Sequence, residues 1–256
     1  TNNVNALANT IFTPNEESTT LFFRASNPNN SSCFEIGEFN IVINNVEIAN
    51  PPIDLEVCGI DNTLEGLFNL TQQNDFIFGN NQAEPNFSIS YFDNELDANN
   101  GVNPITDPAN YTSESQEIWV RIDNLNHPED CYELASFQII ARQIPEIFEV
   151  EEVQICGDFT FTQQVDLATL ETEIFNGPNS SNFTLNFYTT LADATNNVNA
   201  LANTIFTPNE ESTTLFFRAS NPNNTSCFEI GEFNIVVNNV EVANPPIDLE
   251  VCGDGT

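Results

Sequence analysis

Six cysteines are the residues of this 256-residue chain whose chemistry is easiest to anticipate. They stand at positions 33, 58, 131, 156, 227 and 252, so three short gaps of equal length alternate with two long ones. No Cys-x-x-Cys pair occurs and the chain has one histidine, which disfavours a zinc site. Because the chain is also rich in polar Asn and Thr stretches, the cysteines indicate disulfides formed in an oxidising compartment.

The sequence predicts disulfides within one module. Cys58 follows a linker and Cys131 lies in the last predicted hairpin, so we expect both where the chain enters a module. The same reasoning pairs Cys156 with Cys227. A rival pairing joins cysteines across a short gap, such as Cys131 with Cys156, and spacing alone leaves it open. The expected pairs leave two cysteines for partners outside the fragment, namely Cys33 and Cys252.

All four basic side chains are arginines, and three of them recur at one place in the repeat. We expect these three to form ion pairs across the last hairpin: Arg24–Glu35, Arg121–Glu133 and Arg218–Glu229. An aromatic residue two positions earlier faces outward in each case. The outer face is then either simply packed or a lateral or glycan-stacking contact. The residues of that candidate contact are Phe22, Arg24, Trp119, Arg121, Phe216 and Arg218.

An acidic turn after Cys58 is the one candidate metal site. Its spacing, D-x-T-x-E-G, is close to that of a calcium loop and offers Asp61, Thr63 and Glu65 as ligands. The twelfth position is Gln72 rather than the usual Glu, and the turn after Cys156 lacks the pattern. A solvated turn is the alternative reading, and no other cofactor is expected.

Catalysis and nucleic-acid binding are not expected. His127 has neither a marked nucleophile nor an orienting acid beside it, and no phosphate-binding Gly loop or G-x-S-x-G motif occurs. The net charge of −34 opposes nucleic acid and anionic membranes as partners. No 18-residue apolar run is present, so we expect no membrane insertion.

An internal repeat organises the elements that carry these residues. Residues 1–59 recur at 195–253 with only three differences, Ser31/Thr225, Ile43/Val237 and Ile48/Val242. A weaker repeat, of about 96–98 residues, divides the unit in two and has the usual size of a β-sandwich. The expected domains are the last part of a module (1–50), two complete modules (51–147 and 148–243) and the start of a fourth (244–256). The chain is therefore expected to be a window on a longer tandem array.

Alternating apolar residues predict the fold of each module. Ile118, Val120 and Ile122 should point one way and Trp119 and Arg121 the other. About seven such strands predict an all-β fold of tandem immunoglobulin-like β-sandwich modules of about 97 residues. Short Pro-bearing linkers favour an elongated rod. A phase slip after each hairpin cysteine predicts a β-bulge at three residues: Gly37, Ala135 and Gly231.

The module resembles the Cys-rich Ig-like repeats of very large bacterial surface adhesins exported by the type IX secretion system, the SprB-like gliding-motility adhesin family. The motifs that carry the resemblance are Val57-Cys58-Gly59, Phe68-Asn69-Leu70, Tyr91-Phe92, Asp97-Ala98, Trp119-Val120-Arg121 and Cys131. The resemblance implies an extracellular stalk or filament on a bacterial cell surface, with no catalytic residues.

The expected function is a structural and adhesive repeat region, whose partners are neighbouring modules of the same chain and, beyond them, other filaments or surface glycans. One alternative is an array of glycan-binding modules. Another is an accessory region of a secreted hydrolase.

Overall fold

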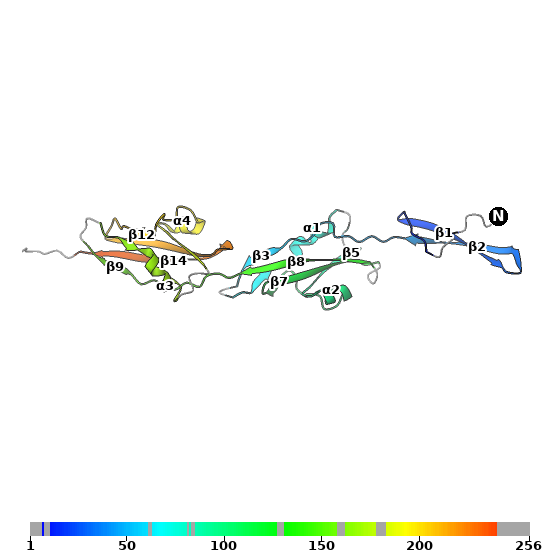
Figure 1. Ribbon diagram of the computed structural model, residues 1–256, viewed down its shortest axis with the longest axis horizontal. Helices are drawn as coiled ribbons and strands as arrows, with labels where there is room; N and C mark the ends of the chain where they lie inside the picture. The colour runs from blue at the N-terminus through cyan, green and yellow to red at the C-terminus, as the bar shows by residue number, and fades with distance from the viewer. Residues whose placement is uncertain are drawn as a thin grey trace, which may run out of the picture. The chain divides into compact units, whose positions relative to one another are not determined.

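The computed structural model describes residues 7, 11–60, 63–80, 82, 85–126, 131–157, 162–177 and 183–239. Within these ranges the chain consists mainly of β-strands, with a few short helices between them (Figure 1). None of the helices in the described ranges is both long and apolar enough to span a membrane.

The first repeat contains a four-stranded sheet of order β3-β8-β7-β5 and a two-stranded sheet of β4 and β6. Its strands are β3 (Leu55–Cys58), β4 (Gly66–Phe68), β5 (Phe87–Phe92), β6 (Tyr111–Ser113), β7 (Gln116–Asn124) and β8 (Tyr132–Arg142). Its short helices are η1 (Leu70–Gln73), α1 (Asn74–Phe78) and α2 (Glu95–Asn100).

The second repeat has the same topology, with a sheet of order β9-β14-β13-β11 and a pair of strands β10 and β12. Its strands are β9 (Val153–Cys156), β10 (Val165–Asp166), β11 (Thr184–Tyr188), β12 (Ile205–Phe206), β13 (Ser212–Asn221) and β14 (Asn224–Asn238). Its helices are η2 (Leu167–Leu170), α3 (Glu171–Ile174) and α4 (Leu191–Asn196). The prediction of tandem immunoglobulin-like sandwiches is confirmed, whereas the exact module boundaries stay a prediction.

One strand pairing decides where the cysteines lie. The first strand of each four-stranded sheet, β3 or β9, runs parallel to the last strand, β8 or β14, whereas the pairs β1–β2, β5–β7, β10–β12, β11–β13 and β13–β14 are antiparallel. Cys58 therefore lies opposite Arg142, and Cys156 lies opposite Asn238. Each of these cysteines is at the end of its repeat from which the last strand leaves.

The alternation read from β7 is visible in its burial. Ile118, Val120 and Ile122 are fully buried, whereas Trp119 between them is half-buried. Alternate side chains of a strand point to opposite faces of its sheet, so one face of β7 belongs to the core. Arg121 lies on the other face, as predicted, and is nevertheless buried.

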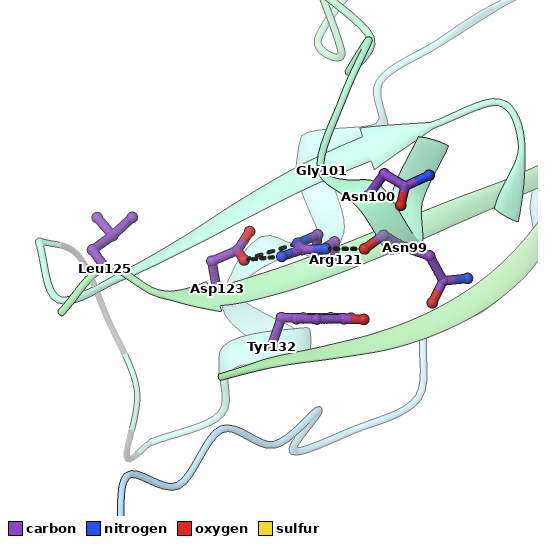
Figure 2. A pocket seen from close by; sticks show the side chains of 7 residues that line it. All are labelled: Asn99, Asn100, Gly101, Arg121, Asp123, Leu125 and Tyr132. Atoms are coloured by element: carbon purple, nitrogen blue, oxygen red, sulfur yellow. Dashed lines mark hydrogen bonds and ion pairs between the residues drawn. The ribbon is translucent and has the colours of Figure 1, made fainter. Parts of the chain in front are cut away.

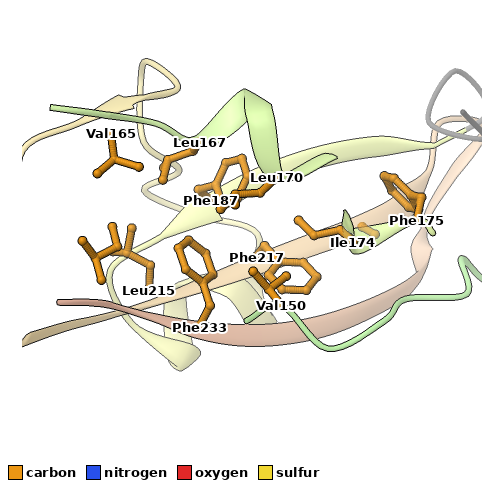
Figure 3. Packing of buried hydrophobic residues seen from close by; sticks show 12 residues of the cluster. Val150, Val165, Leu167, Leu170, Ile174, Phe175, Phe187, Leu215, Phe217 and Phe233 are labelled. Carbon is orange, nitrogen blue, oxygen red and sulfur yellow. The ribbon is translucent and has the colours of Figure 1, made fainter. Parts of the chain in front are cut away.

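The core of the second repeat is a cluster between its sheet and the helical segment η2–α3 (Figure 3). Leu167 and Ile174 from the helical segment pack with Leu215 and Phe217 of β13 and Phe233 of β14. The helical segment η2–α3 therefore belongs to the core of this repeat. It covers the sheet with apolar side chains that a longer strand would have split between two faces.

The predicted β-bulge at Gly231 is wrong. Pairing of β13 with β14 runs without interruption through Phe217 and Gly231, and the register shifts only at Ser220/Asn221, beside the turn. Glycine is required because a Cβ at position 231 would collide with the ring of Phe217. The apparent phase slip arises because Phe228 and Ile230 lie on the outer face of the sheet, away from the core.

The hairpin of β1 (Ser18–Asn27) and β2 (Asn30–Val42) is the sequence twin of β13–β14 and has the same pairing. Its environment differs. Phe23 is 54% exposed where its twin Phe217 is 1% exposed, and Phe39 is 50% exposed where Phe233 is 3% exposed. The same residues therefore occur once in a packed core and once on an open sheet face.

Candidate functional site

The two ends of each repeat carry different cysteines. We use "exit cysteine" for Cys58, Cys156 and Cys252, and "hairpin cysteine" for Cys33, Cys131 and Cys227. Cys58 lies beside the end of β8, whereas Cys131 immediately precedes its start. A strand of this length spans about 35 Å, and a disulfide needs Cα atoms within about 7 Å.

The predicted Cys58–Cys131 and Cys156–Cys227 disulfides are therefore wrong. The prediction placed both partners where the chain enters a module, but the parallel pairing of the first and last strands carries the exit cysteine to the opposite end. The rival pairing of Cys131 with Cys156 is not formed either, since both are free thiols in the structure.

The disulfide that the structure contains joins the exit cysteine of the first repeat, Cys58, to the hairpin cysteine of the second, Cys227. Their Cα atoms are 5.2 Å apart, and 169 positions separate them in sequence. Cys227 is fully buried. Cys33 is a free, exposed thiol, and Cys252 lies outside the described residues.

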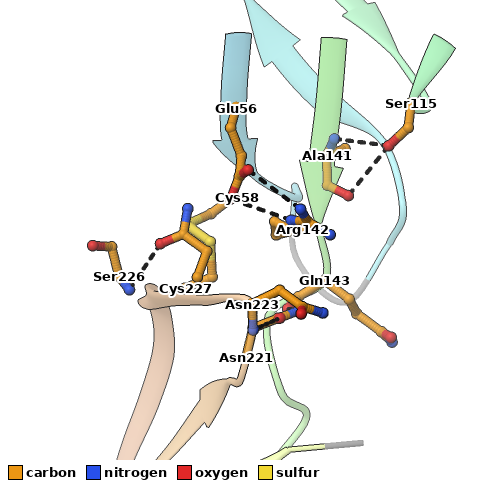
Figure 4. A network of polar contacts seen from close by, with 11 residues as sticks. Glu56, Cys58, Ser115, Ala141, Arg142, Gln143, Asn221, Asn223, Ser226 and Cys227 are labelled. Carbon is orange, nitrogen blue, oxygen red and sulfur yellow. Dashed lines mark hydrogen bonds and ion pairs between the residues drawn. A yellow bond between two sulfur atoms is a disulfide. The ribbon is translucent and has the colours of Figure 1, made fainter. Parts of the chain in front are cut away.

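Polar groups surround this disulfide (Figure 4). The residues drawn belong to one compact unit of the structure. Asn221 shapes its hairpin by accepting a 3.0 Å hydrogen bond from the backbone of Asn223, and its side-chain amide donates to the Gln143 carbonyl at 3.1 Å. The hairpin of one repeat is thus held to the segment that leaves the other repeat.

An ion pair flanks the exit cysteine. Arg142 Nε lies 3.2 Å from Glu56 Oε1, and both side chains are about one-third exposed. The hydrogen bond from Arg142 is the main reason why the pKa of Glu56 is lower than usual. Desolvation opposes this shift, and a hydrogen bond from Asn224 adds to it. The second repeat has Gln154 in place of Glu56, 3.5 Å from the amide of Asn238.

The lowered pKa predicts how acid affects this junction. A carboxylate whose pKa is lower in the folded state stabilises the fold above its unfolded pKa, and this contribution is lost as pH falls through the folded pKa. Between pH 6 and pH 3 we therefore expect the Glu56→Gln variant to lose less stability than the native chain. The difference should be at most about 1 kcal/mol, because the pair is partly exposed. Urea unfolding at both pH values measures it, and equal losses would contradict the assignment.

Short helices, absent from the sequence reading, explain the recurrent arginines. The side chain of Asn94 accepts a 2.9 Å hydrogen bond from the backbone of Asp97 at the start of α2, and Gly101 ends the helix in the left-handed conformation. The helix is therefore short and is capped at both ends. The corresponding residues of α4 in the second repeat are Thr190, Asp193 and Asn197.

Arg121 closes the carboxyl end of α2 (Figure 2). Its Nη1 donates to the carbonyl oxygens of Ala98 at 2.9 Å and Asn99 at 2.7 Å. Its other nitrogens contact Asp123 Oδ1 at 2.8 Å, and its guanidinium lies 3.7 Å from the centre of the Tyr132 ring. A cation is favoured here by the carbonyl oxygens at the helix end and by the aromatic face.

Arg218 occupies the same place in the second repeat. Its Nη1 donates to Ala194 and Thr195 carbonyls, each at 3.0 Å, and its Nη2 donates to the Thr225 carbonyl at 2.6 Å. Its guanidinium lies 3.3 Å from the centre of the Phe228 ring. The side chain is buried, and desolvation lowers its pKa, but an arginine remains charged at neutral pH.

The predicted ion pairs across the hairpin are not the contacts that the arginines make. Arg218 pairs with Ile230 across the hairpin and Arg24 with Ile36, so the intervening Glu229 and Glu35 point to the opposite face. In the first repeat Arg121 packs on Tyr132 and bonds to Asp123, which places the next residue, Glu133, on the other face. The pairs to be corrected are Arg24–Glu35, Arg121–Glu133 and Arg218–Glu229.

Replacing Arg218 by methionine is expected to destabilise the second repeat by about 3 kcal/mol. The change removes charge-assisted bonds to three carbonyls in a buried place, each worth about 1.5–3 kcal/mol before compensation. The matched control is Arg24→Met. Arg24 is bonded to the Ser31 carbonyl at 2.8 Å in the exposed twin hairpin, so we expect a loss below about 1 kcal/mol. Urea unfolding compares the two variants, and equal losses would refute the helix-closing role.

A polar cavity of about 500 Å³ opens beside Arg121, between the end of α2 and the Tyr132 ring (Figure 2). The guanidinium groups of Arg121 and Arg218 are already bonded to carbonyls inside the fold, so their role in this arrangement is to stabilise the fold. The aromatic members of the candidate lateral or glycan contact are more accessible: Phe22 is 69% exposed, and Trp119 and Phe216 are half-buried. Their contact with another filament or a glycan stays a prediction.

The candidate calcium ligands are only partly described. Asp61 lies outside the described residues, as does His127. Thr63 donates its hydroxyl to the Ile60 carbonyl at 2.7 Å and accepts from the Glu65 backbone at 3.2 Å, which is an ordinary turn. Over the part of the chain that the structure describes, no three His, Cys, Asp or Glu side chains gather as a metal site would require.

Sequence reasoning missed Glu56, Arg142 and Asn221 as junction residues. The available signal was the Asn that precedes each hairpin turn, at positions 27, 124 and 221. Asn at such a place binds its own backbone two residues on, as Asn221 does. The signal for Glu56 and Arg142 was weaker, because each occurs in only one of the two repeat types.

The family model for the Flavobacterium inter-domain disulphide bond domain matches residues 54–145 and 152–241. A search of curated proteins found no match. Similar solved structures include a three-domain immunoglobulin fragment of titin, at 9% identity and TM-score 0.31, covering 73% of this chain and 62% of that one.

Two cadherin structures are also similar. A fragment of Drosophila N-cadherin has 12% identity and a TM-score of 0.24, with coverage of 88% of this chain and 60% of that one. A fragment of mouse clustered protocadherin gamma C3 has 10% identity and a TM-score of 0.27, with coverage of 88% and 77%. The chain thus spans about three-fifths of the length of the titin and N-cadherin fragments.

Proposed function

The chain belongs to the Flavobacterium inter-domain disulphide bond domain family, and we propose that it is a non-catalytic stalk of immunoglobulin-like repeats on a bacterial cell surface. The observation that carries the proposal is the disulfide between Cys58 and Cys227. It ties the exit end of one repeat to the hairpin of the next. A disulfide in that place prevents the two repeats from separating.

The repeat extends this bond into a rule. Each complete repeat has one exit cysteine and one hairpin cysteine, so every repeat can be bonded to both neighbours. The rule assigns Cys131 to the exit cysteine of the repeat before and Cys156 to the hairpin cysteine of the repeat after. Neither partner is among the residues that the structure describes, which agrees with both being free thiols in it.

Formation of each bond needs an oxidant. Two thiols lose two protons and two electrons when they form one disulfide, and a disulfide-carrying oxidoreductase is the class of acceptor that we assign to this step. Such exchange belongs to an oxidising compartment, which supports an extracellular location. The net charge of −34 would keep neighbouring filaments soluble and apart.

Adhesion is the finer part of the proposal. We assign the chain to the kind of large type IX-secreted, SprB-like surface adhesin that its motifs resemble, with residues 51–147 and 148–243 as its complete modules. Intact cells treated with a surface protease should lose the protein and attach less well. Unchanged attachment after complete removal would leave the stalk without an adhesive role.

The disulfide rule can be tested on an extended chain made of residues 1–253 followed by residues 60–253, which continues the repeat in phase. In the 256-residue chain, alkylation should label Cys131 and Cys156. In the extended chain it should no longer label Cys156 of the first copy or Cys131 of the second. A Cys156→Ser change in the first copy should expose the second-copy Cys131. Release of the first-copy Cys131 instead would support the neighbour pairing and refute the rule.

A further inference from the structure

The spacing between a hairpin cysteine and the next exit cysteine is constant, and the spacing across the rest of a repeat is not. The segments 33–58, 131–156 and 227–252 have the same length, whereas the segment 58–131 is two positions longer than the segment 156–227. The segments 33–58 and 227–252 are copies of one duplicated stretch, so the independent match is that of 131–156 with both. This match indicates that the length of the short segment matters, while the length of the longer one can vary.

The structure shows what the short segment consists of. From Cys131 to Cys156 it runs through β8, a linker that bears Pro145, and β9. β8 and β9 are extended strands, and an extended strand can be stretched only slightly further. At about 3.3–3.6 Å per residue, the whole segment reaches no further than about 90 Å when drawn straight.

The disulfide connects two such segments. The covalent path from Cys33 to Cys252 can follow the chain to Cys58, cross the bond to Cys227, and follow the chain again. This path uses only residues 33–58 and 227–252, whereas the backbone path between the same two cysteines uses all of 33–252. Residues 59–226 lie on a closed loop that the shorter path bypasses.

The strands along these paths are neighbours in the sheet. In the first repeat one path leaves through β3 to the exit cysteine, and the other passes from the hairpin cysteine along β8. These two strands are hydrogen-bonded in parallel, with Leu55 opposite Ile139 and Cys58 opposite Arg142. The other strands of the repeat, β4 to β7, lie between the two cysteines in sequence and are off both paths.

We propose that the disulfide and these short segments form the tension-bearing tracks of the stalk, and that the remainder of each repeat is shielded from pulling force. The proposal deepens the stalk function and rests on it. Tension applied along the stalk is carried by strands that are already extended and by a covalent bond. The body of the sandwich can then vary in sequence and length, as the segments 58–131 and 156–227 do, without weakening the stalk.

Single-molecule stretching of the whole chain tests this directly. Handles are attached to the thiols of Cys33 and Cys252 after Cys131 and Cys156 are replaced by serine. The end-to-end extension of the oxidised chain should reach its limit at about 175 Å, the length of roughly 50 extended residues, without unfolding steps from the second repeat. After reduction it should extend to about 750 Å, because roughly 220 residues then carry the load.

In the matched control the force is applied to the second repeat along a path that does not follow the short segments and the disulfide. With handles on Cys156 and Cys252 and the other two free cysteines, Cys33 and Cys131, replaced by serine, the second repeat lies directly between the handles. It should unfold and release about 96 residues, or about 330 Å, with or without reductant.

Two failures can be told apart. If alkylation shows that Cys58 and Cys227 are not bonded, the cross-linked stalk itself is refuted. A second outcome is that they are bonded but pulling between Cys33 and Cys252 gives unfolding steps at the forces that unfold the control. In that case the short segments do not carry the tension. The shielding proposal is then overturned while the stalk remains.

Discussion

Removing the disulfide with the double change Cys58→Ala and Cys227→Ala is expected to lower the free energy of unfolding by about 5 kcal/mol. The bond closes a loop in which its cysteines are 169 positions apart, and in the chain-entropy model such a loop costs the unfolded chain about this much conformational freedom. Urea unfolding followed by the fluorescence of Trp119, the only tryptophan, measures the loss.

The control for this change replaces two of the free cysteines, Cys33 and Cys156. Cys33 is the sequence twin of Cys227, so Cys33→Ala makes the same chemical change in the same local sequence without opening a loop. Replacing Cys33 and Cys156 together should change the free energy of unfolding by less than about 0.5 kcal/mol. Equal losses in the two double variants would mean that the cross-link itself does not stabilise the chain.

The fold was readable from the sequence because burial repeats at the period of the strands. In β7 the buried residues Ile118, Val120 and Ile122 alternate with the half-buried Trp119 and the hydrogen-bonded Arg121, as a strand with one face in the core requires. The repeat of 1–59 at 195–253 supplied a second, independent reason to expect tandem modules. Both signals are local or are copied along the chain, so neither needs knowledge of which strands lie side by side.

The disulfide was not readable for the opposite reason. Its partners depend on whether the first strand runs parallel or antiparallel to the last, and the four residues of β3 carry no mark of that choice. With the antiparallel choice, Cys58 would lie at the hairpin end and could reach Cys131. With the parallel choice it lies about 35 Å away and faces the next repeat. One topological alternative therefore decides which cysteine Cys58 can reach.

The role of the arginines could have been read from helix capping. Asn94-x-x-Asp97 and Thr190-x-x-Asp193 are N-terminal capping patterns, and Gly101 suits a helix end. Helices of six residues leave too few periods for hydrophobic patterning to reveal them, so the caps were the only local signal. That Arg121 lies at the end of such a helix depends on the packing of α2 against β7, which no local pattern encodes.

Replacing Phe217 by alanine is expected to cost the second repeat about 3–5 kcal/mol, as for other large aromatic residues removed from a core. The ring is 1% exposed, lies over Gly231, and has its centroid 6.4 Å from that of Phe233. Neighbours this constrained by the sheet cannot move far enough to fill the space. Denaturant unfolding followed by far-ultraviolet circular dichroism measures the loss.

The chain contains its own control for this experiment. Phe23 has the same neighbours in sequence and the same strand pairing, since it faces Gly37 as Phe217 faces Gly231. It is 54% exposed, so Phe23→Ala should cost less than about 0.5 kcal/mol. Because the two hairpins have the same local propensities, any difference between the variants measures tertiary packing alone. Equal losses would show that the hairpin is stabilised by its own strands, and that the rest of the sandwich adds little to it.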